Sequence, residues 1–428
     1  MKRLSSAALV LVLVALSADA GPRRRAVAQP GTRPSESTPA GWLAANAHVL
    51  HSIDLVPDSS DLRPLRSMIG SSEMVALGDV THGTHEFYTV KLRVVDFLVR
   101  ELDFDVVAFE APFPLVERIN QYVQGGPGNA RALLNEMSPI TYFFWDAEEI
   151  AALVEWMREY NAHRGARRPV FVAGFDVTQP DASSNAVVTY LRSVDPVYAV
   201  EAEQQYACAR ESNLIIDKDC QTRAKRILDA LTEREAELIA KSSRTAYDDA
   251  QHQARVVVQS RFPFGSDRDQ AMAANAIWLR DRRGETGKMI LWGHSAHFAQ
   301  SEHAWTGRRP MGKVLEESIG GDFFTITTMT AAGTFLQWED PTHTRNFVAK
   351  TTALPSVAPG SYESFFRLRG EPFLLIPFRK ALPEWLATPK LYNAAGVNGL
   401  PGIVGSLPLQ YDAAIFIDTT TPLRPIPD

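Results

Sequence analysis

Short apolar blocks alternate along the chain with longer segments in which apolar residues recur at helical spacing. The first block, residues 74–77, ends at Gly78, and a second block, residues 106–109, ends at Glu110. The residues between them are apolar at helical spacing, at Phe87, Val90, Val94, Phe97 and Leu98. A continuous apolar block is typical of a buried parallel strand, and the spacing between the blocks is typical of an amphipathic helix. This segment therefore predicts a strand, a helix and a second strand.

The same alternation continues toward the C-terminus. Further strands are expected at residues 169–173, 288–292, 323–329, 334–338, 373–377 and 411–417. Helices are expected at residues 113–122, at 149–161 and from 268 toward Gly284. Residues 331–333 predict a turn that pairs the strands on either side of it. The alternation predicts an α/β fold with a mostly parallel central sheet flanked by helices.

The composition changes between residues 195 and 259. This segment is rich in Glu, Arg, Ala, Leu and Gln and has no strand signal. We interpret it as a helical insertion or subdomain, which divides the α/β domain into a first part at residues 42–194 and a second part at 260–428.

The N-terminus has the pattern of an export signal. Lys2 and Arg3 precede an apolar run at residues 7–16, which is too short to span a bilayer, and a small-x-small cleavage site ends at Ala20. We expect residues 1–20 to be a signal peptide and the following polar segment, 21–41, to be a flexible leader. The pattern predicts a periplasmic or extracellular protein without stable membrane insertion.

Composition and cysteine content are those of a globular protein, and the cysteines are compatible with export. The chain has 428 residues, of which 45% are hydrophobic and 22% charged, so it can bury a large core. Its net charge of -6 provides no basic field for nucleic acid. The two cysteines, Cys208 and Cys220, would form a disulfide in an oxidising compartment and would otherwise be free thiols.

Chemically reactive side chains follow several predicted strands. Because parallel strands end at one edge of a sheet, Asp79, His82 and Glu110 are expected to lie close together. Two more histidines, His294 and His297, follow a later predicted strand. The sequence therefore predicts a cluster of histidines and carboxylates at the carboxyl edge of the sheet.

These segments resemble the erythromycin esterase-like family. The resemblance covers about residues 50 to 418 and is carried by 78–83, 86–87, Lys91, 108–110, 145–161, 268–275, 292–294, 311–312 and 359–363. The family typically has Glu where this chain has Asp79. The resemblance implies a hydrolase of carboxylic esters or macrolide lactones, an association with antibiotic resistance, and catalytic roles for His82, Glu110 and the stretch containing His294.

Ester hydrolysis requires a base that takes a proton from the attacking water. A histidine with a pKa near ~6.5 is suited to this, and His82 is our candidate, oriented by Asp79 or Glu110. His294 or His297 would polarise the carbonyl or protonate the leaving oxygen. Candidates for substrate binding are Lys91, which could balance developing negative charge, His85 and Asp176. The scheme needs a small-molecule ester and no cofactor.

A serine hydrolase is one alternative. Residues 293–297 read Gly-His-Ser-Ala-His, which nearly matches the nucleophile elbow Gly-x-Ser-x-Gly and follows a predicted strand. Ser295 would then be the nucleophile, with His303 or His343 as its base. The last glycine of the motif is missing, and a histidine there would crowd the sharp turn.

A metal or haem site is the other alternative. It would use His82, His85, His294 and His297, although the chain has no His-Glu-x-x-His motif. A non-catalytic member of the family is a related hypothesis, because Asp79 replaces the family's Glu. The sequence makes no prediction about the oligomeric state.

Overall fold

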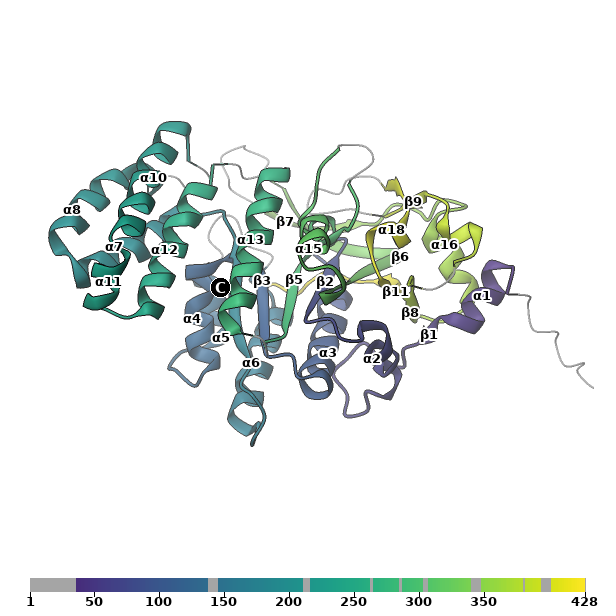
Figure 1. Cartoon of the computed structure of the whole chain (residues 1–428). Coiled ribbons are helices and arrows are strands. Elements are labelled where there is room, and N and C mark those ends of the chain that lie inside the picture. The colour runs from purple at the N-terminus through teal and green to yellow at the C-terminus, as the bar shows by residue number, and fades with distance from the viewer. Residues whose placement is uncertain are drawn as a thin grey trace, which may run out of the picture.

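The computed structural model describes residues 36–137, 145–210, 216–261, 265–284, 287–302, 307–339, 348–379, 382–393 and 402–427. The expected signal peptide and most of the expected leader lie outside these ranges. Figure 1 shows a central sheet with helices on both faces and a further group of helices beside one edge. Within the described residues, no helix combines the length and apolar character that crossing a membrane requires.

The described residues form a sheet of nine strands. Along the sheet the order is β1 (His48–Val49), β8 (Phe373–Pro377), β11 (Ala413–Thr420), β6 (Phe323–Glu339), β2 (Met74–Asp79), β5 (Met289–His294), β3 (Val106–Pro112) and β4 (Phe171–Asp176). Every neighbouring pair from β11 to β4 is parallel. Strands β8 and β1 are antiparallel, as is β7 (Val348–Ala353), which pairs with β6. The prediction of a mostly parallel α/β sheet is confirmed.

Alternate side chains of the central strands enter two separate cores. Val75 and Leu77 of β2 pack in a cluster that contains residues of α3 (His85–Leu102), α4 (Phe113–Val123) and α6 (Glu148–His163). Met74 and Ala76 pack on the opposite face, against α13 (Ser266–Arg283) and α15 (Met311–Ile319). A strand buried on both faces reads as a continuous apolar block because neither face is solvated.

Several shorter elements complete the part of the structure outside the helical unit described below. They are α1 (Pro39–Asn46), α2 (Pro64–Ile69), α5 (Ala130–Met137), α14 (Ser295–Phe298), α16 (Tyr362–Phe366), α17 (Glu384–Ala387), α18 (Leu407–Gln410), and the paired strands β9 (Lys390–Tyr392) and β10 (Ile403–Gly405). Several of them surround a third core at the β8 and β11 end of the sheet.

The predicted turn at residues 331–333 is wrong. Residues 323–329 and 334–338 belong to one continuous strand, β6, whose second half pairs with β7. Gly333 lies opposite Thr420 of β11, and a Cβ atom on Gly333 would meet the Thr420 carbonyl oxygen at 2.1 Å. Gly333, which favours a turn in the sequence, is needed here because two backbones approach closely.

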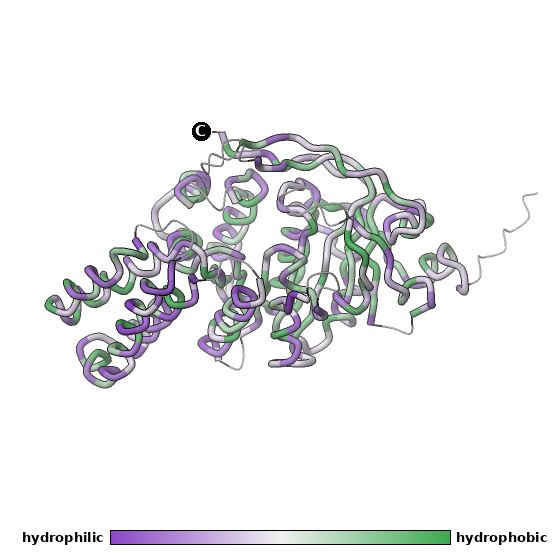
Figure 2. Tube along the Cα trace, turned by 90° about the horizontal axis from the view of Figure 1, so that it is seen from above, coloured by the Kyte–Doolittle hydropathy of each residue, from purple (hydrophilic) through white to green (hydrophobic). Residues whose placement is uncertain are grey.

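Beyond β4 the chain forms a helical unit with its own core. It contains α7 (Pro180–Val194), α8 (Pro196–Gln205), α9 (Ala207–Arg210), α10 (Lys218–Glu233), α11 (Glu235–Lys241) and α12 (Arg244–Gln259). Helix α7 precedes the expected start of the insertion at residue 195, yet its Val187, Val188 and Leu191 pack in this core. In Figure 2 hydrophobic and hydrophilic residues alternate along these helices, as expected of helices with one buried face.

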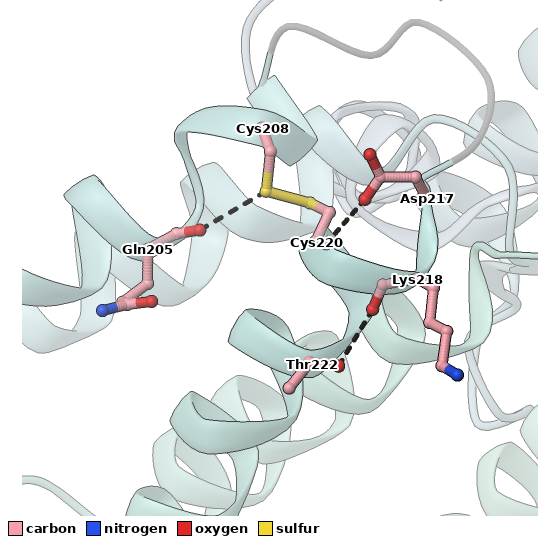
Figure 3. Close-up of a disulfide and its surroundings, with 6 residues drawn as sticks. All are labelled: Gln205, Cys208, Asp217, Lys218, Cys220 and Thr222. Atoms are coloured by element: carbon pink, nitrogen blue, oxygen red, sulfur yellow. Dashed lines mark hydrogen bonds between the residues drawn. A yellow bond between two sulfur atoms is a disulfide. The ribbon is translucent and has the colours of Figure 1, made fainter.

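A disulfide links Cys208 and Cys220 and so joins α9 to the start of α10 (Figure 3). Asp217 caps α10 by accepting a hydrogen bond from the Cys220 backbone N–H, at 2.7 Å. The bridge spans a sequence separation of 12 residues.

Replacing both cysteines with serine is expected to lower the free energy of unfolding by about 2–3 kcal/mol, because the unfolded chain regains the freedom that this loop closure removes. The measurement is thermal unfolding followed by far-UV circular dichroism, with and without dithiothreitol. The reductant should lower the midpoint of the wild-type protein and leave that of the double variant unchanged. Equal midpoints for the two proteins in the absence of reductant would contradict this.

Candidate active site

Four strands of the sheet deliver polar side chains to their common carboxyl edge. Asp79 ends β2, Glu110 lies near the end of β3, Asp176 ends β4 and His294 ends β5. Asp79 and His294 are register partners on neighbouring strands. The pairing of β3 with β4 shifts between Phe109 and Pro112, and such an irregularity re-aims side chains near strand ends. We call this set of side chains, with those that bind them, the rim.

The loop after β2 places His82 against Asp79. The His82 Nδ1 atom lies 2.9 Å from Asp79 Oδ1, and both side chains are buried. The other carboxylate oxygen of Asp79 accepts a hydrogen bond of 2.5 Å from Lys91 Nζ. Lys91 is 1% exposed, and its ammonium also lies over the Trp292 ring, 4.4 Å from the centroid. The shorter Asp79 side chain therefore reaches both a histidine and a lysine.

Glu110 connects the two histidine segments. Its Oε2 lies 3.9 Å from His82 Nε2 and accepts a hydrogen bond of 2.8 Å from the His294 backbone N–H. A Cβ atom on Gly293 would lie 2.8 Å from the same oxygen, so glycine is required for this approach. Its Oε1 lies 3.1 Å from His297 Nε2 and 3.0 Å from a guanidinium nitrogen of Arg268.

His294 occupies the N-cap position of α14. Its Nδ1 accepts a hydrogen bond from the Ala296 backbone N–H at 3.1 Å, so a neutral His294 carries its proton on Nε2. Burial and the neighbouring His82 lower the pKa of His294 to about 3, which makes the ring neutral at ordinary pH. Its ring centroid lies 5.0 Å from that of His82. Among the described residues, no group hydrogen-bonds the buried Nε2.

His297 has the opposite electrostatic environment. Its Nδ1 lies 2.5 Å from Asp269 Oδ1, and its Nε2 faces Glu110. Burial alone would lower the pKa of His297, but the carboxylates of Glu110 and Asp269 outweigh burial and raise it. Arg308 also pairs with Asp269, through its Nε atom. The structure thus brings together one histidine that favours the neutral form and one that favours the charged form.

Both acids that face His82 remain ionised. Burial alone would raise the pKa of Asp79, but Lys91 and His82 hold it below its ordinary value. Burial would likewise raise the pKa of Glu110, but His297 and Arg268 hold it well below its ordinary value. Burial lowers the pKa of Lys91, and Asp79 opposes this effect.

Asp176 and Arg268 form a buried pair at the end of β4. Arg268 donates two hydrogen bonds to the Asp176 carboxylate, at 2.9 and 2.6 Å, and a third to Glu110. The paired carboxylate of Asp176 orients Arg268, whereas the sequence suggested that Asp176 binds substrate. Arg268 and Asp269 lie in a segment that carries the family resemblance, but no local sequence pattern assigns either of them, or Arg308, a role at the rim.

His85 is not brought to the rim. It begins α3, and its Nδ1 lies 2.5 Å from Glu149 Oε1 on α6. Arg424 donates to the same Glu149 oxygen at 2.8 Å. The ion pair therefore ties α3 to α6 and to the C-terminal segment, and it gives His85 a structural role.

Ser295 contacts a threonine rather than a base. Its hydroxyl is 2.8 Å from the Thr327 hydroxyl, and a Cβ atom on Gly78 would lie 2.6 Å from the Ser295 Oγ. The two histidines suggested as its base, His303 and His343, lie outside the described residues. For the metal hypothesis, the part of the chain that the structure describes contains no group of three or more His, Cys, Asp or Glu side chains arranged to hold an ion.

The fold and the rim place the chain among α/β proteins that gather histidines and carboxylates at the carboxyl edge of a parallel sheet. The erythromycin esterase profile matches residues 99–420, and the chain belongs to this family. Membership supports a hydrolase that acts on a small molecule. The match begins after the segment that contains Asp79, His82 and Lys91.

Two curated relatives are similar over much of the chain. A putative hydrolase of Bacillus subtilis, YbfO, is 24% identical and aligns with 89% of this chain and 91% of its own length. Erythromycin esterase type II of Escherichia coli is 23% identical, with coverage of 65% and 74% respectively.

Solved structures share the fold. A protein from Bacillus cereus superposes with a TM-score of 0.79 at 24% identity, and covers 91% of this chain and 98% of its own. A mutant of the erythromycin esterase EreC, in its open conformation, has a TM-score of 0.72 at 15% identity, with coverage of 88% and 98%.

Proposed function

We propose that the chain hydrolyses a carboxylic ester, by means of a water molecule that His82 deprotonates. The observation that carries this proposal is the position of His82 between two ionised acids, with Nδ1 at 2.9 Å from Asp79 and Nε2 at 3.9 Å from Glu110. Asp79 favours the proton on Nδ1, which leaves Nε2 as the base. A separation of 3.9 Å is too long for a direct hydrogen bond, and a water molecule can contact both groups across it.

The proposed reaction has two steps. First, the water oxygen bonds to the ester carbonyl carbon while His82 Nε2 takes the water proton, which leaves a tetrahedral oxyanion. The carbon–oxygen bond to the alcohol then breaks, and His82 returns the proton to the leaving oxygen. The products are an acid and an alcohol, or one hydroxy acid if the substrate is a lactone.

His294 is the proposed donor to the oxyanion. Its neutral ring presents an Nε2–H that no described group hydrogen-bonds, in a region where burial strengthens such a bond. Arg268 and His297, whose pKa is raised, stabilise Glu110 as an anion, and Lys91 does the same for Asp79. Glu110 then orients the water, and Asp79 stabilises the imidazolium that forms at His82.

His294→Asn is expected to lower kcat about a hundredfold with a smaller change in KM, because it removes a donor used in the transition state. Asparagine is a good N-cap residue, so α14 should persist. His294 is neutral at any pH above about 3, so the pH–rate profile of the variant should keep the limbs of the wild-type profile. A limb displaced in the variant would show that His294 itself titrates during the reaction.

The family name and a relative named erythromycin esterase support a macrolide lactone as the substrate. A screen tests this proposal together with the general one. Purified protein is incubated with macrolides and with simple esters, and mass spectrometry detects the gain of one water. Ring-opened macrolide supports both proposals, and turnover of simple esters alone supports only ester hydrolysis. No hydrolysis of any ester in the panel would contradict both.

We also propose that the protein acts after export, in the periplasm or outside the cell. The disulfide and the pattern of the first 20 residues support this. Expression of the full chain in a bacterium, followed by mass analysis of the periplasmic fraction, should yield a shortened protein that lacks the signal peptide. A full-length protein with reduced cysteines in the cytoplasm would contradict export.

A further inference from the structure

A groove of about 690 Å³ lies between the helical unit and the β4 edge of the sheet. Its walls come from α4, α7, α12 and α13, and from β3 and β4 themselves. The rim residues Asp79, His82, Glu110 and His294 do not line it. The volume is in the range of small-molecule sites, so the groove is large enough to bind a ligand at a place separate from the rim.

One face of α12 is directed to this groove. Ala246, Asp249, Ala250 and Gln253 line it at positions i, i+3, i+4 and i+7. Gln253 is only 4% exposed, and within the described residues its Oε1 has no hydrogen-bond donor. A buried acceptor without a donor is uncommon, because water is excluded from it. A ligand N–H group would satisfy it.

Among the described residues, Glu117 is the groove carboxylate that makes no direct ion pair, although Arg282 is close enough to lower its pKa. Asp249 pairs with Arg282 at 2.8 Å, and Arg283 pairs with Asp105 at 3.1 Å. Glu117 on α4 instead accepts a hydrogen bond from the neutral amide of Gln121, at 3.5 Å.

The surroundings of Glu117 also disfavour the ionised form of its carboxyl group. Burial raises the pKa of Glu117 and the nearby carboxylate of Asp249 adds to this, which outweighs the lowering by hydrogen bonds from Gln121 and Asn120 and by the charge of Arg282. A positively charged ligand group beside Glu117 would oppose both effects, because it would compensate the half-buried negative charge.

The rest of the wall is largely apolar and aromatic. Phe113, Phe171 and Leu279 lie on the sheet side, and Tyr190 lies on the side of the helical unit. We propose that this groove is a second ligand site, which binds an organic cation with an apolar body, such as an arylalkylamine. The ammonium group pairs with Glu117 and donates to Gln253, and the apolar body packs between the aromatic side chains.

Isothermal titration of the full protein with phenethylamine tests this site, and phenethyl alcohol is the neutral probe of the same shape. The amine should bind at one site, about tenfold more tightly than the alcohol. Glu117→Gln should remove this preference, and Glu201→Gln, an exposed control on α8, should keep it. Ala246→Phe, which fills the groove from α12, should abolish binding of both probes.

His82→Ala separates the groove from the rim, because binding in the groove should be unaffected by this change. Absence of amine binding would overturn the proposal, as would equal affinity for amine and alcohol. Binding that survives Ala246→Phe but is lost in His82→Ala would place the amine at the rim and would also overturn it. The comparison of the two probes needs no variant, so it stands even if Glu117→Gln fails to fold.

Discussion

The variant His82→Ala is expected to hydrolyse esters about a thousandfold more slowly than the wild-type protein, in the middle of the range for loss of a general base. Alanine cannot take the proton of the attacking water, and the pairing of Asp79 with Lys91 does not replace it. The change should lower kcat, because the proton moves in the transition state rather than on binding. Hydrolysis is measured by product formation under saturating substrate.

Folding should be affected much less than the rate. His82 is buried but small, and Asp79 keeps its lysine partner when the histidine is removed. The matched control is His163→Ala, which changes an exposed histidine on α6 and should keep full activity. The assignment of His82 as the base would be wrong if the His82 variant kept its activity. It would also be wrong if unfolding of the variant under the assay conditions accounted for the whole loss of rate.

Lys91→Met is expected to destabilise the fold by about 3–5 kcal/mol, because it leaves Asp79 charged, buried and without its strongest partner. Methionine has nearly the shape of lysine, so the loss should reflect charge rather than a cavity. Because Lys91 helps to hold the pKa of Asp79 below its ordinary value, its removal should raise that pKa.

The sign of the pH dependence follows from that shift. A carboxyl whose pKa is lower in the folded than in the unfolded protein stabilises the fold. This stabilisation is fully present above the pKa of the unfolded state, about 4, and it is lost as the pH falls through the pKa of the folded state. The difference in unfolding free energy between wild type and Lys91→Met should therefore be largest near neutral pH and shrink in acid. Urea unfolding between pH 3 and 7 measures it.

Lys225→Met is the control for this prediction. Lys225 forms an exposed pair with Asp229 on α10, and such pairs contribute about 0–1 kcal/mol. A loss for Lys91→Met no larger than that for Lys225→Met would contradict the importance of the buried pair. Methionine also leaves the stacking position over Trp292 occupied, so the packing there is largely kept.

Much of the fold was readable because the central strands are buried on both faces. Residues 74–77, 106–109 and 289–292 form unbroken apolar blocks, and they lie within β2, β3 and β5. The sequence pattern predicts two strands where the structure has the single strand β6, since Gly333 approaches the β11 backbone closely and does not form a turn. Such a contact joins segments far apart in sequence, and no local pattern reports it.

The rim could be anticipated only in part, for a similar reason. Asp79, His82 and Glu110 follow predicted parallel strands, so they were expected to lie at one edge of the sheet, and the structure places them together. The arginine that joins Glu110 to Asp176 lies at residue 268, beyond the helical unit, so sequence spacing could not connect it to them. The sequence pattern of a single helix also does not predict the burial of Lys91, because a lysine on a helix is by default expected to be exposed to solvent.

The proposed mechanism depends most on water, rather than a side chain, attacking the ester. The most direct test is intact-protein mass spectrometry of a rapidly quenched reaction with excess substrate, in which product formation is followed in the same samples. Direct attack by water predicts that acid product accumulates while the protein mass stays unchanged. Product formation accompanied by an acyl adduct, mapped to Ser295 or to any other side chain, would contradict it.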